Sequence, residues 1–187
     1  MRIVGGKHRG RRIEGPADER LRPTSDRARE ALFNILEHGR LSADGRSLLP
    51  GAHVLDVFCG TGAFALEALS RGAAHATLID NAPEAIALAR RNLRNAGEIA
   101  RATIIEADAT RPPPPPQRHT IAFLDPPYRS GLAPVALEAL GNGGWLSPGA
   151  ICIVEVEARE RFEAPPGFTP VDERRYGRAR LVFLRAA

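Results

Sequence analysis

The residues with the most specific chemical potential form the tetrapeptide Asp125-Pro126-Pro127-Tyr128, which directly follows an apolar, strand-like stretch. Two successive prolines fix the backbone and predict a rigid corner from which the Asp125 carboxylate and the Pro126 carbonyl point outward. Two such acceptors can hold both N–H bonds of an aryl amine and stabilise the positive charge that develops on its nitrogen. Tyr128 can stack on the ring that carries the amine. The motif therefore predicts group transfer to an exocyclic amine, with Asp125, Pro126, Pro127 and Tyr128 as catalytic residues and no metal.

A second set of residues predicts a binding site for a ligand. In the segment Asp56-Val57-Phe58-Cys59-Gly60-Thr61-Gly62, the glycines allow a tight turn into a helix with no Cβ between backbone and ligand. The first amides of that helix favour a negative group such as a carboxylate. About twenty residues further on, Asp80 can accept hydrogen bonds from both hydroxyls of a ribose. Asp108 offers a polar partner for an adenine amino group.

The glycine loop alone leaves two cofactor classes open. Gly60-x-Gly62-x-x-Ala65 also fits the tolerant form of the dinucleotide fingerprint, so a nicotinamide-dependent reductase is the alternative. Asp56 disfavours that alternative, because a carboxylate there is poorly placed beside a pyrophosphate but can help to position a cationic aminoacyl ligand.

These residues need a scaffold that gathers strand ends at one place. After a short extended segment (1–13) and a helix with apolar residues from Ala28 to Leu36, strands are expected at 54–58, 77–79, 102–105, 121–124, 151–156 and 181–184. Helices are expected at 63–70, from Pro83 to near Gly97, and at 133–140. This alternation predicts an α/β fold with a doubly wound, mostly parallel sheet. The last two strands are expected to pair antiparallel as an edge hairpin, and the run Pro112–Pro116 to be a non-helical connection at the surface.

Length and composition favour one globular domain. The chain has 187 residues, of which 43% are hydrophobic and 26% charged, and it contains no apolar run long enough to span a bilayer. The amino terminus lacks the apolar core of a secretory signal, so a cytoplasmic monomer without membrane contact is expected. Cys59 and Cys152 form no CxxC pair, which excludes the common zinc-site patterns and a disulfide framework.

The positive charge of the chain is concentrated near its amino terminus. Residues 1–29 contain nine basic and four acidic side chains, so this segment carries +5 while the rest of the chain carries −1. Such a distribution favours a polyanionic partner. The alternative is a solvated basic face in an arginine-rich chain, in which Lys7 is the only lysine.

Four segments together resemble one protein family. They are MRIVGGKHRGRRI, LRPTSDRAREALFNIL, VLDVFCGTGAFALEALSRGA and FLDPPY, and the similarity runs over nearly the whole chain. They are similar to the bacterial family that methylates guanine N2 in small-subunit (16S) ribosomal RNA. The one departure is the proline run, which replaces a more ordinary linker near the target-facing edge.

The resemblance implies a Rossmann-like class I methyltransferase fold, S-adenosylmethionine as cofactor, and small-subunit ribosomal RNA or a small ribosomal particle as partner. Residues 1–22 would form a basic, RNA-contacting β-hairpin extension, and residues 23–187 the methyltransferase domain. The implied cofactor-binding residues are Thr24, Asp56, Phe58, Gly60, Gly62, Asp80, Asn81, Asp108 and Ala109, with Arg22 and Pro23 near the methionine end. The implied RNA-binding residues are Arg2, Lys7, Arg9, Arg11, Arg12 and Arg22.

Other functions remain compatible with the same motifs. Adenine N6 and cytosine N4 are also exocyclic amines, so a methyltransferase of another base stays open, although the absence of a DNA-recognition domain favours RNA. A protein glutamine methyltransferase would be expected to carry Asn in place of Asp125. A catalytically inert RNA-binding module on the same fold is the alternative of a different class.

Overall fold

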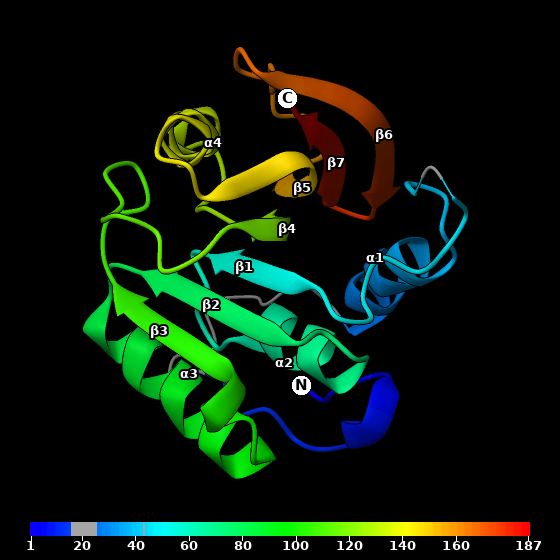
Figure 1. Cartoon of the computed structure of the whole chain (residues 1–187), viewed down its shortest axis with the longest axis vertical. Coiled ribbons are helices and arrows are strands. Elements are labelled where there is room, and N and C mark those ends of the chain that lie inside the picture. Colours follow the sequence, from blue (N-terminus) through cyan, green and yellow to red (C-terminus); the bar gives the residue numbers. More distant parts are fainter. Residues whose placement is uncertain (16–25, 43) are drawn as a thin grey trace.

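The computed structural model of the chain describes residues 1–15, 26–42 and 44–187 (Figure 1). Its elements are, in chain order, η1 (Gly6–His8), α1 (Asp26–Glu37), β1 (His53–Val57), α2 (Ala63–Ser70), β2 (His75–Asp80), α3 (Pro83–Ala96), η2 (Ile99–Arg101), β3 (Ala102–Glu106), β4 (His119–Leu124), α4 (Leu132–Asn142), β5 (Leu146–Glu157), β6 (Phe168–Tyr176) and β7 (Ala179–Ala186). Across these described ranges, no helix is both long and apolar enough to cross a membrane.

The strands form a seven-stranded sheet in the order β3-β2-β1-β4-β5-β7-β6. The pairs β2–β3, β1–β2, β1–β4 and β4–β5 are parallel, whereas β5–β7 and β6–β7 are antiparallel. Parallel strands need long crossovers, and α2, α3 and α4 supply three of them. Between β3 and β4 the chain crosses without a helix, because this connection contains the run Pro112–Pro116.

Two apolar cores lie on the two faces of the sheet. One joins the sheet to α1, α2 and α3, and its buried aromatic residues include Phe33, Phe64 and Phe123. The other joins the sheet to α4, which lies on the opposite side from α2 and α3 (Figure 1), and contains the fully buried Trp145. Helices on both faces of a mostly parallel sheet confirm the predicted doubly wound α/β architecture.

The prediction for the carboxyl-terminal strands is partly wrong. β5 and β7 pair antiparallel as expected, but β6 intervenes between them in the chain, and the edge hairpin is β6–β7. β6 is largely exposed and charged, and it contains Pro170 next to a register shift. An edge strand tolerates proline and charge because one side of its backbone faces solvent, so it lacks the apolar pattern of a strand.

The amino-terminal segment folds back on itself, but the predicted β-hairpin is reduced to a single antiparallel bridge between Arg2 and Arg12. Its turn is the one-turn helix η1. Some backbone amides, such as those of Ile3 and Ile13, donate across the two arms. Others, such as those of Val4 and His8, donate to side chains of α2. Ile3 and Ile13 are almost completely buried and belong to the core on the α2 side. The segment therefore packs as part of the domain, while the predicted boundary between residues 22 and 23 lies outside the described residues.

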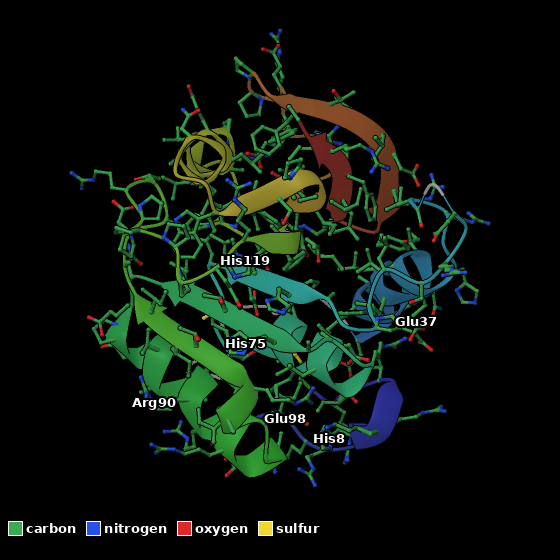
Figure 2. All side chains as sticks on the ribbon, in the orientation of Figure 1. His8, Glu37, His75, Arg90, Glu98 and His119 are labelled. Carbon is green, nitrogen blue, oxygen red and sulfur yellow. The ribbon has the colours of Figure 1, made fainter. Side chains whose placement is uncertain are left out.

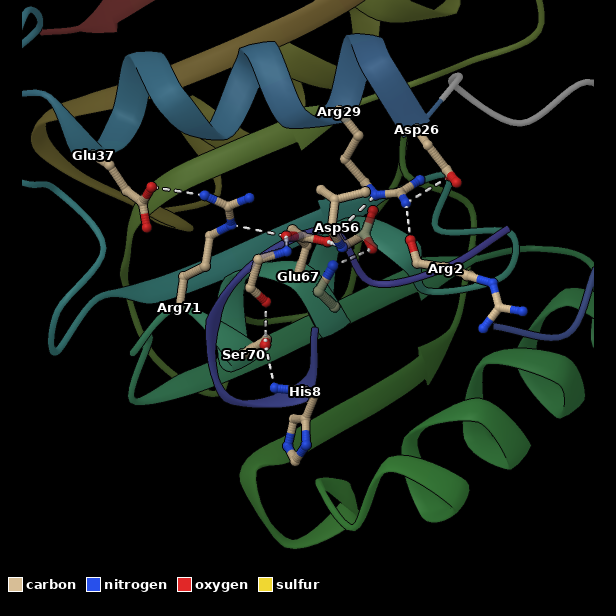
Figure 3. Close-up of polar contacts among 12 residues, drawn as sticks. Arg2, His8, Asp26, Arg29, Glu37, Asp56, Glu67, Ser70 and Arg71 are labelled. Carbon is tan, nitrogen blue, oxygen red and sulfur yellow. Dashed lines mark hydrogen bonds and ion pairs between the residues drawn. The ribbon is translucent and has the colours of Figure 1, made fainter. Parts of the chain in front are cut away.

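A buried polar network holds this segment in place (Figure 3). The Glu67 carboxylate, on α2, accepts hydrogen bonds from the backbone amides of Val4 (2.8 Å) and Gly5 (2.7 Å). It also accepts one from Arg71 Nε (2.8 Å) and lies 3.6 Å from Arg29 Nε. Arg29 in turn donates to the carbonyl of Arg2, so α1, α2 and the amino-terminal segment are joined around one carboxylate.

Candidate active site at the carboxyl edge of the sheet

The segments that follow the parallel strands β1, β2, β3 and β4 meet at one edge of the sheet. The amide of Cys59, after β1, donates to the carbonyl of Ile79 (3.1 Å), and Asp125, after β4, donates to Val57 (3.3 Å). The amide of Ala107, after β3, donates to the carbonyl of Asp80 (2.9 Å). The winding of the sheet reverses between β1 and β4, which is where ligands bind in open α/β sheets.

Backbone strain is concentrated at this edge. Among the described residues, the only two non-glycine residues with positive φ are Phe58 and Arg129, both at 59°. Phe58 follows β1, and Arg129 lies just beyond the Asp-Pro-Pro-Tyr corner after β4. Such conformations cost free energy and cluster at functional sites, so their position on both sides of the switch point marks it as the candidate site.

The glycine loop has the conformation that only glycine adopts without strain. Gly60 and Gly62 have φ values of 51° and 74°. A Cβ on Gly60 would meet no atom within 4 Å, so this position opens onto free space. A Cβ on Gly62 would lie 3.1 Å from Leu78 Cδ2, so this glycine also lets α2 approach β2 closely.

The two carboxylates next to the loop have different surroundings. Asp80 is partly exposed and accepts hydrogen bonds from the amides of Gly60 (3.0 Å) and Ala82 (3.0 Å). Asp56 is buried and accepts one from the amide of Ala65 (3.1 Å), in the first turn of α2. Burial raises the pKa of Asp56 well above its usual value. Asp56 therefore fixes the start of α2, while Asp80 holds the loop and keeps an accessible surface.

The remaining residues predicted to bind the cofactor lie along the same edge or outside the described residues. Asp108 is part of a turn in which it accepts hydrogen bonds from the amide and hydroxyl of Thr110, and these bonds lower the pKa of Asp108. Ala109 is buried, and Asn81 is exposed at the start of α3. Thr24 and Arg22 lie outside the described residues.

The corner after β4 combines a buried proline with exposed groups. Pro126 is buried, Asp125 is half-buried, and Pro127 is exposed. The Tyr128 side chain is 42% exposed, yet its hydroxyl donates a hydrogen bond to Glu155 Oε1 (2.9 Å). Burial and the neighbouring Glu155 carboxylate raise the pKa of Tyr128, so its phenol is neutral and acts as a donor.

Two buried polar residues near the site did not stand out in the sequence. Asn92, on α3, donates to the carbonyls of Thr61 (3.0 Å) and Glu14 (3.0 Å), and so ties the glycine loop to the amino-terminal segment. Glu155 lies in the otherwise apolar strand β5 and is only 3% exposed. A charged residue inside an apolar strand pattern is the signal that could have identified Glu155.

Except for Arg22, which lies outside the described residues, the predicted RNA-binding residues lie at the opposite edge. Lys7 forms an ion pair with Glu98 (2.7 Å), and His8 also contacts that carboxylate at the end of α3 (Figure 2). The Arg2 side chain bonds to the carbonyl of Gly10 (2.9 Å), and Arg11 to that of Asn95 (3.1 Å). The side chains of Arg9 and Arg12 are exposed and make no hydrogen bond or ion pair with any residue that the structure describes.

The histidine of β4, His119, has a structural role in the core. Both ring nitrogens of the buried His119 are bonded, one to Thr77 Oγ1 (2.9 Å) and one to the carbonyl of Trp145 (3.0 Å). Burial lowers the pKa of His119 to about 4, so the ring is neutral. Over the ranges 1–15, 26–42 and 44–187, no group of His, Cys, Asp and Glu is arranged to hold a metal ion.

Comparison with known proteins identifies the family. A model of the family described as "Conserved hypothetical protein 95" matches residues 1–185. The ribosomal RNA small subunit methyltransferase D of Escherichia coli is 36% identical over 172 residues, which cover 89% of this chain and 79% of the relative. The chain belongs to the ribosomal RNA small subunit methyltransferase D family.

Solved structures agree with this family membership. A putative methyltransferase from Escherichia coli superimposes with a TM-score of 0.81 and 34% identity, covering 100% of this chain and 97% of that chain. An RNA methyltransferase from Salinibacter ruber in complex with S-adenosyl-L-homocysteine shares the fold at a TM-score of 0.66 and 14% identity, covering 88% and 94%. The predicted Rossmann-like class I methyltransferase fold is thereby confirmed for this member of the methyltransferase D family.

Proposed function

We propose that this protein transfers a methyl group from S-adenosylmethionine to the exocyclic N2 amine of a guanine in small-subunit ribosomal RNA. The observation that carries the proposal is the position of the Asp-Pro-Pro-Tyr corner, joined to the end of β1 by the bond from Asp125 to Val57 (3.3 Å). The position of the corner beside the end of β1, where the glycine loop begins, supports its assignment as the amine-binding motif. The names of the relatives support the ribosomal substrate, and the resemblance in sequence favours guanine.

The cofactor fits the residues at this edge. The open space at Gly60 leaves room for a ligand against the backbone, and Asp80 presents a carboxylate to a ribose at the end of β2. Asp56 fixes the first turn of α2, whose remaining amides can face the carboxylate of the cofactor. S-Adenosylmethionine bound there supplies an electrophilic methyl group.

The residues of the corner would then prepare the amine. The Asp125 carboxylate and the Pro126 carbonyl accept the two N–H bonds, which directs the nitrogen lone pair toward the methyl group and stabilises the charge that develops. The Tyr128 ring stacks on the base. Alignment of the two reactants can lower the barrier by about 7–11 kcal/mol, without a metal or a covalent enzyme intermediate.

The experiment that tests the proposal is methyl transfer from labelled S-adenosylmethionine to small ribosomal particles that lack the modification, followed by nucleoside analysis. The expected result is label in N2-methylguanosine. Label in methyladenosine or methylcytidine would keep the mechanism and overturn the choice of base. Tight cofactor binding without transfer to particles or to naked RNA would favour the inert RNA-binding module.

We also propose that the amino-terminal segment contributes a second RNA contact. The guanidinium groups of Arg9 and Arg12 are exposed and have no partner within the described ranges. Arg90 and Arg94 add exposed positive charge on the neighbouring helix α3 (Figure 2 labels Arg90). α3 leads from the cofactor edge to Glu98, where Lys7 and His8 bind. Its 14 residues correspond to about 21 Å, so the two RNA contacts would lie on different nucleotides.

The double substitution Arg9→Ala/Arg12→Ala is expected to weaken RNA binding and to flatten its salt dependence. Each lost phosphate contact should reduce the slope of log affinity against log salt by about 0.7–0.9, because fewer counterions are released. Affinity measured between low and moderate salt checks this. Arg46→Ala, which removes an exposed arginine in the loop before β1, is the control. An unchanged slope in the double variant would remove this segment from the RNA interface.

A further inference from the structure

The corner that carries the amine-binding residues is fastened to the end of β5. Besides the bond from Tyr128 to Glu155, the backbone amide of Arg129 donates to Glu160 Oε2 (3.0 Å). The Arg129 guanidinium pairs with Glu157. Three carboxylates at or just after the end of β5 therefore hold Tyr128, the last residue of the corner, and Arg129, which follows it and has the strained φ of 59°.

Glu155 differs from the other two carboxylates because it is buried. It is 3% exposed, in a strand whose neighbouring residues are apolar. A buried carboxylate is costly unless it is hydrogen-bonded. β4 and β5 pair with Leu124 opposite Val154, so Asp125, just after β4, and Glu155, on β5, each follow one member of this pair. Besides burial, both carboxylates raise the pKa of the Tyr128 phenol, so Glu155 lies in the same neighbourhood as the predicted amine acceptor.

We propose that Glu155 is a positioning residue that fixes the Tyr128 ring for stacking on the target base through its hydrogen bond to the phenol. This inference rests on the proposed function. It adds a residue that acts through Tyr128 and contacts neither the cofactor nor the base. The two prolines fix the backbone before Tyr128, but they leave its side-chain torsions free. The bond to Glu155 restrains those torsions, while 42% of the side chain remains exposed for contact with the base.

The test compares methyl transfer by Glu155→Leu, Glu155→Gln, Tyr128→Phe and the double variant Tyr128→Phe/Glu155→Leu. Loss of a hydrogen bond to a charged group is expected to lower kcat about 10- to 100-fold in Glu155→Leu and Tyr128→Phe. Glu155→Gln keeps an acceptor for the phenol and should restore most of the rate. The double variant should lose no more than either single variant, because both remove the same bond. Affinity for S-adenosylmethionine should stay unchanged in all four.

Three outcomes would overturn the positioning role. They are additive losses in the double variant, a loss in Glu155→Gln as large as in Glu155→Leu, and full activity of Tyr128→Phe. Tyr176→Phe is the matched control, since the chain contains two tyrosines and Tyr176 lies on the edge strand β6. Tyr128→Phe changes an exposed side chain, so it gives an answer even if Glu155→Leu does not fold.

A spectroscopic readout needs neither RNA nor turnover, and so separates this inference from the proposed function. In the Tyr176→Phe background, Tyr128 is the only tyrosine, and its ionisation is followed by ultraviolet absorbance. The Glu155 carboxylate raises the pKa of the phenol, so adding Glu155→Leu should lower the pH at which phenolate forms while circular dichroism shows an intact fold. An unchanged titration would show that the bond to Glu155 does not hold the ring.

Discussion

Replacing Asp125 by alanine is expected to lower the rate of methyl transfer at least about a thousand-fold, while the affinity for S-adenosylmethionine changes by no more than about threefold. The carboxylate is proposed to act only where charge develops on the amine, and removal of a group of this kind from a preorganised site costs about 10²–10³ in rate. Loss of one of the two acceptors also releases the amine from its alignment, which adds to the effect. Single-turnover transfer and calorimetric cofactor binding measure the two quantities separately.

Asp125→Asn is the matched control for this prediction. It retains the volume of the side chain and one neutral acceptor, so its rate should lie between those of the wild type and Asp125→Ala. The bond from the Asp125 amide to Val57 involves the backbone and persists in both variants. An equal loss of cofactor affinity and of rate in Asp125→Ala would instead assign Asp125 to the support of the fold.

Glu67→Ala is expected to reduce the free energy of unfolding by about 3–5 kcal/mol. The carboxylate is completely buried and bonded to two backbone amides and Arg71, with Arg29 3.6 Å away. Its removal leaves two buried guanidinium groups without their shared partner, and breaking a buried ion pair in this way is strongly destabilising. Urea denaturation followed by circular dichroism measures the change.

The matched control is Glu37→Gln. Glu37 binds the same Arg71 side chain (2.6 Å), but its own side chain is 33% exposed. An ion pair with solvent access contributes little, so the expected loss is at most about 1 kcal/mol. Similar losses from Glu67→Ala and Glu37→Gln would mean that Arg71 pairing matters and that the anchoring of Val4 and Gly5 does not.

The sequence predicted those parts of the fold whose signals are local. α2 begins and ends as predicted, because a glycine turn precedes it and Gly72 follows it, and the central strands carry short apolar runs between such turns. β6 was missed because an edge strand with Pro170 and four consecutive charged residues does not resemble a buried strand. β5 was predicted only over its apolar part, Ile151–Val156, whereas the strand begins at Leu146 and ends at Glu157.

The residues of the candidate site that directly follow strands could be predicted from the sequence. Asp56, Asp80, Asp108 and Asp125 could be predicted together because the carboxyl ends of parallel strands meet at one edge. The partners of Tyr128 and of the glycine loop were not predictable, because Glu155 lies 27 residues after Tyr128 and Asn92 lies 31 residues after Thr61. Such pairings depend on tertiary packing, which residue spacing alone does not encode.

The docking of the amino-terminal segment sets an order for folding during synthesis. Its partners Glu67, Asn92 and Glu98 lie 63, 78 and 90 residues further along the chain from Val4, Glu14 and His8. The segment is synthesised before α2 and α3 and cannot dock until they are present, and closing loops of this length costs entropy before any contact forms. Ile3 and Ile13 remain exposed on the nascent chain until then, so this segment is synthesised well before the helices that bury its apolar side chains.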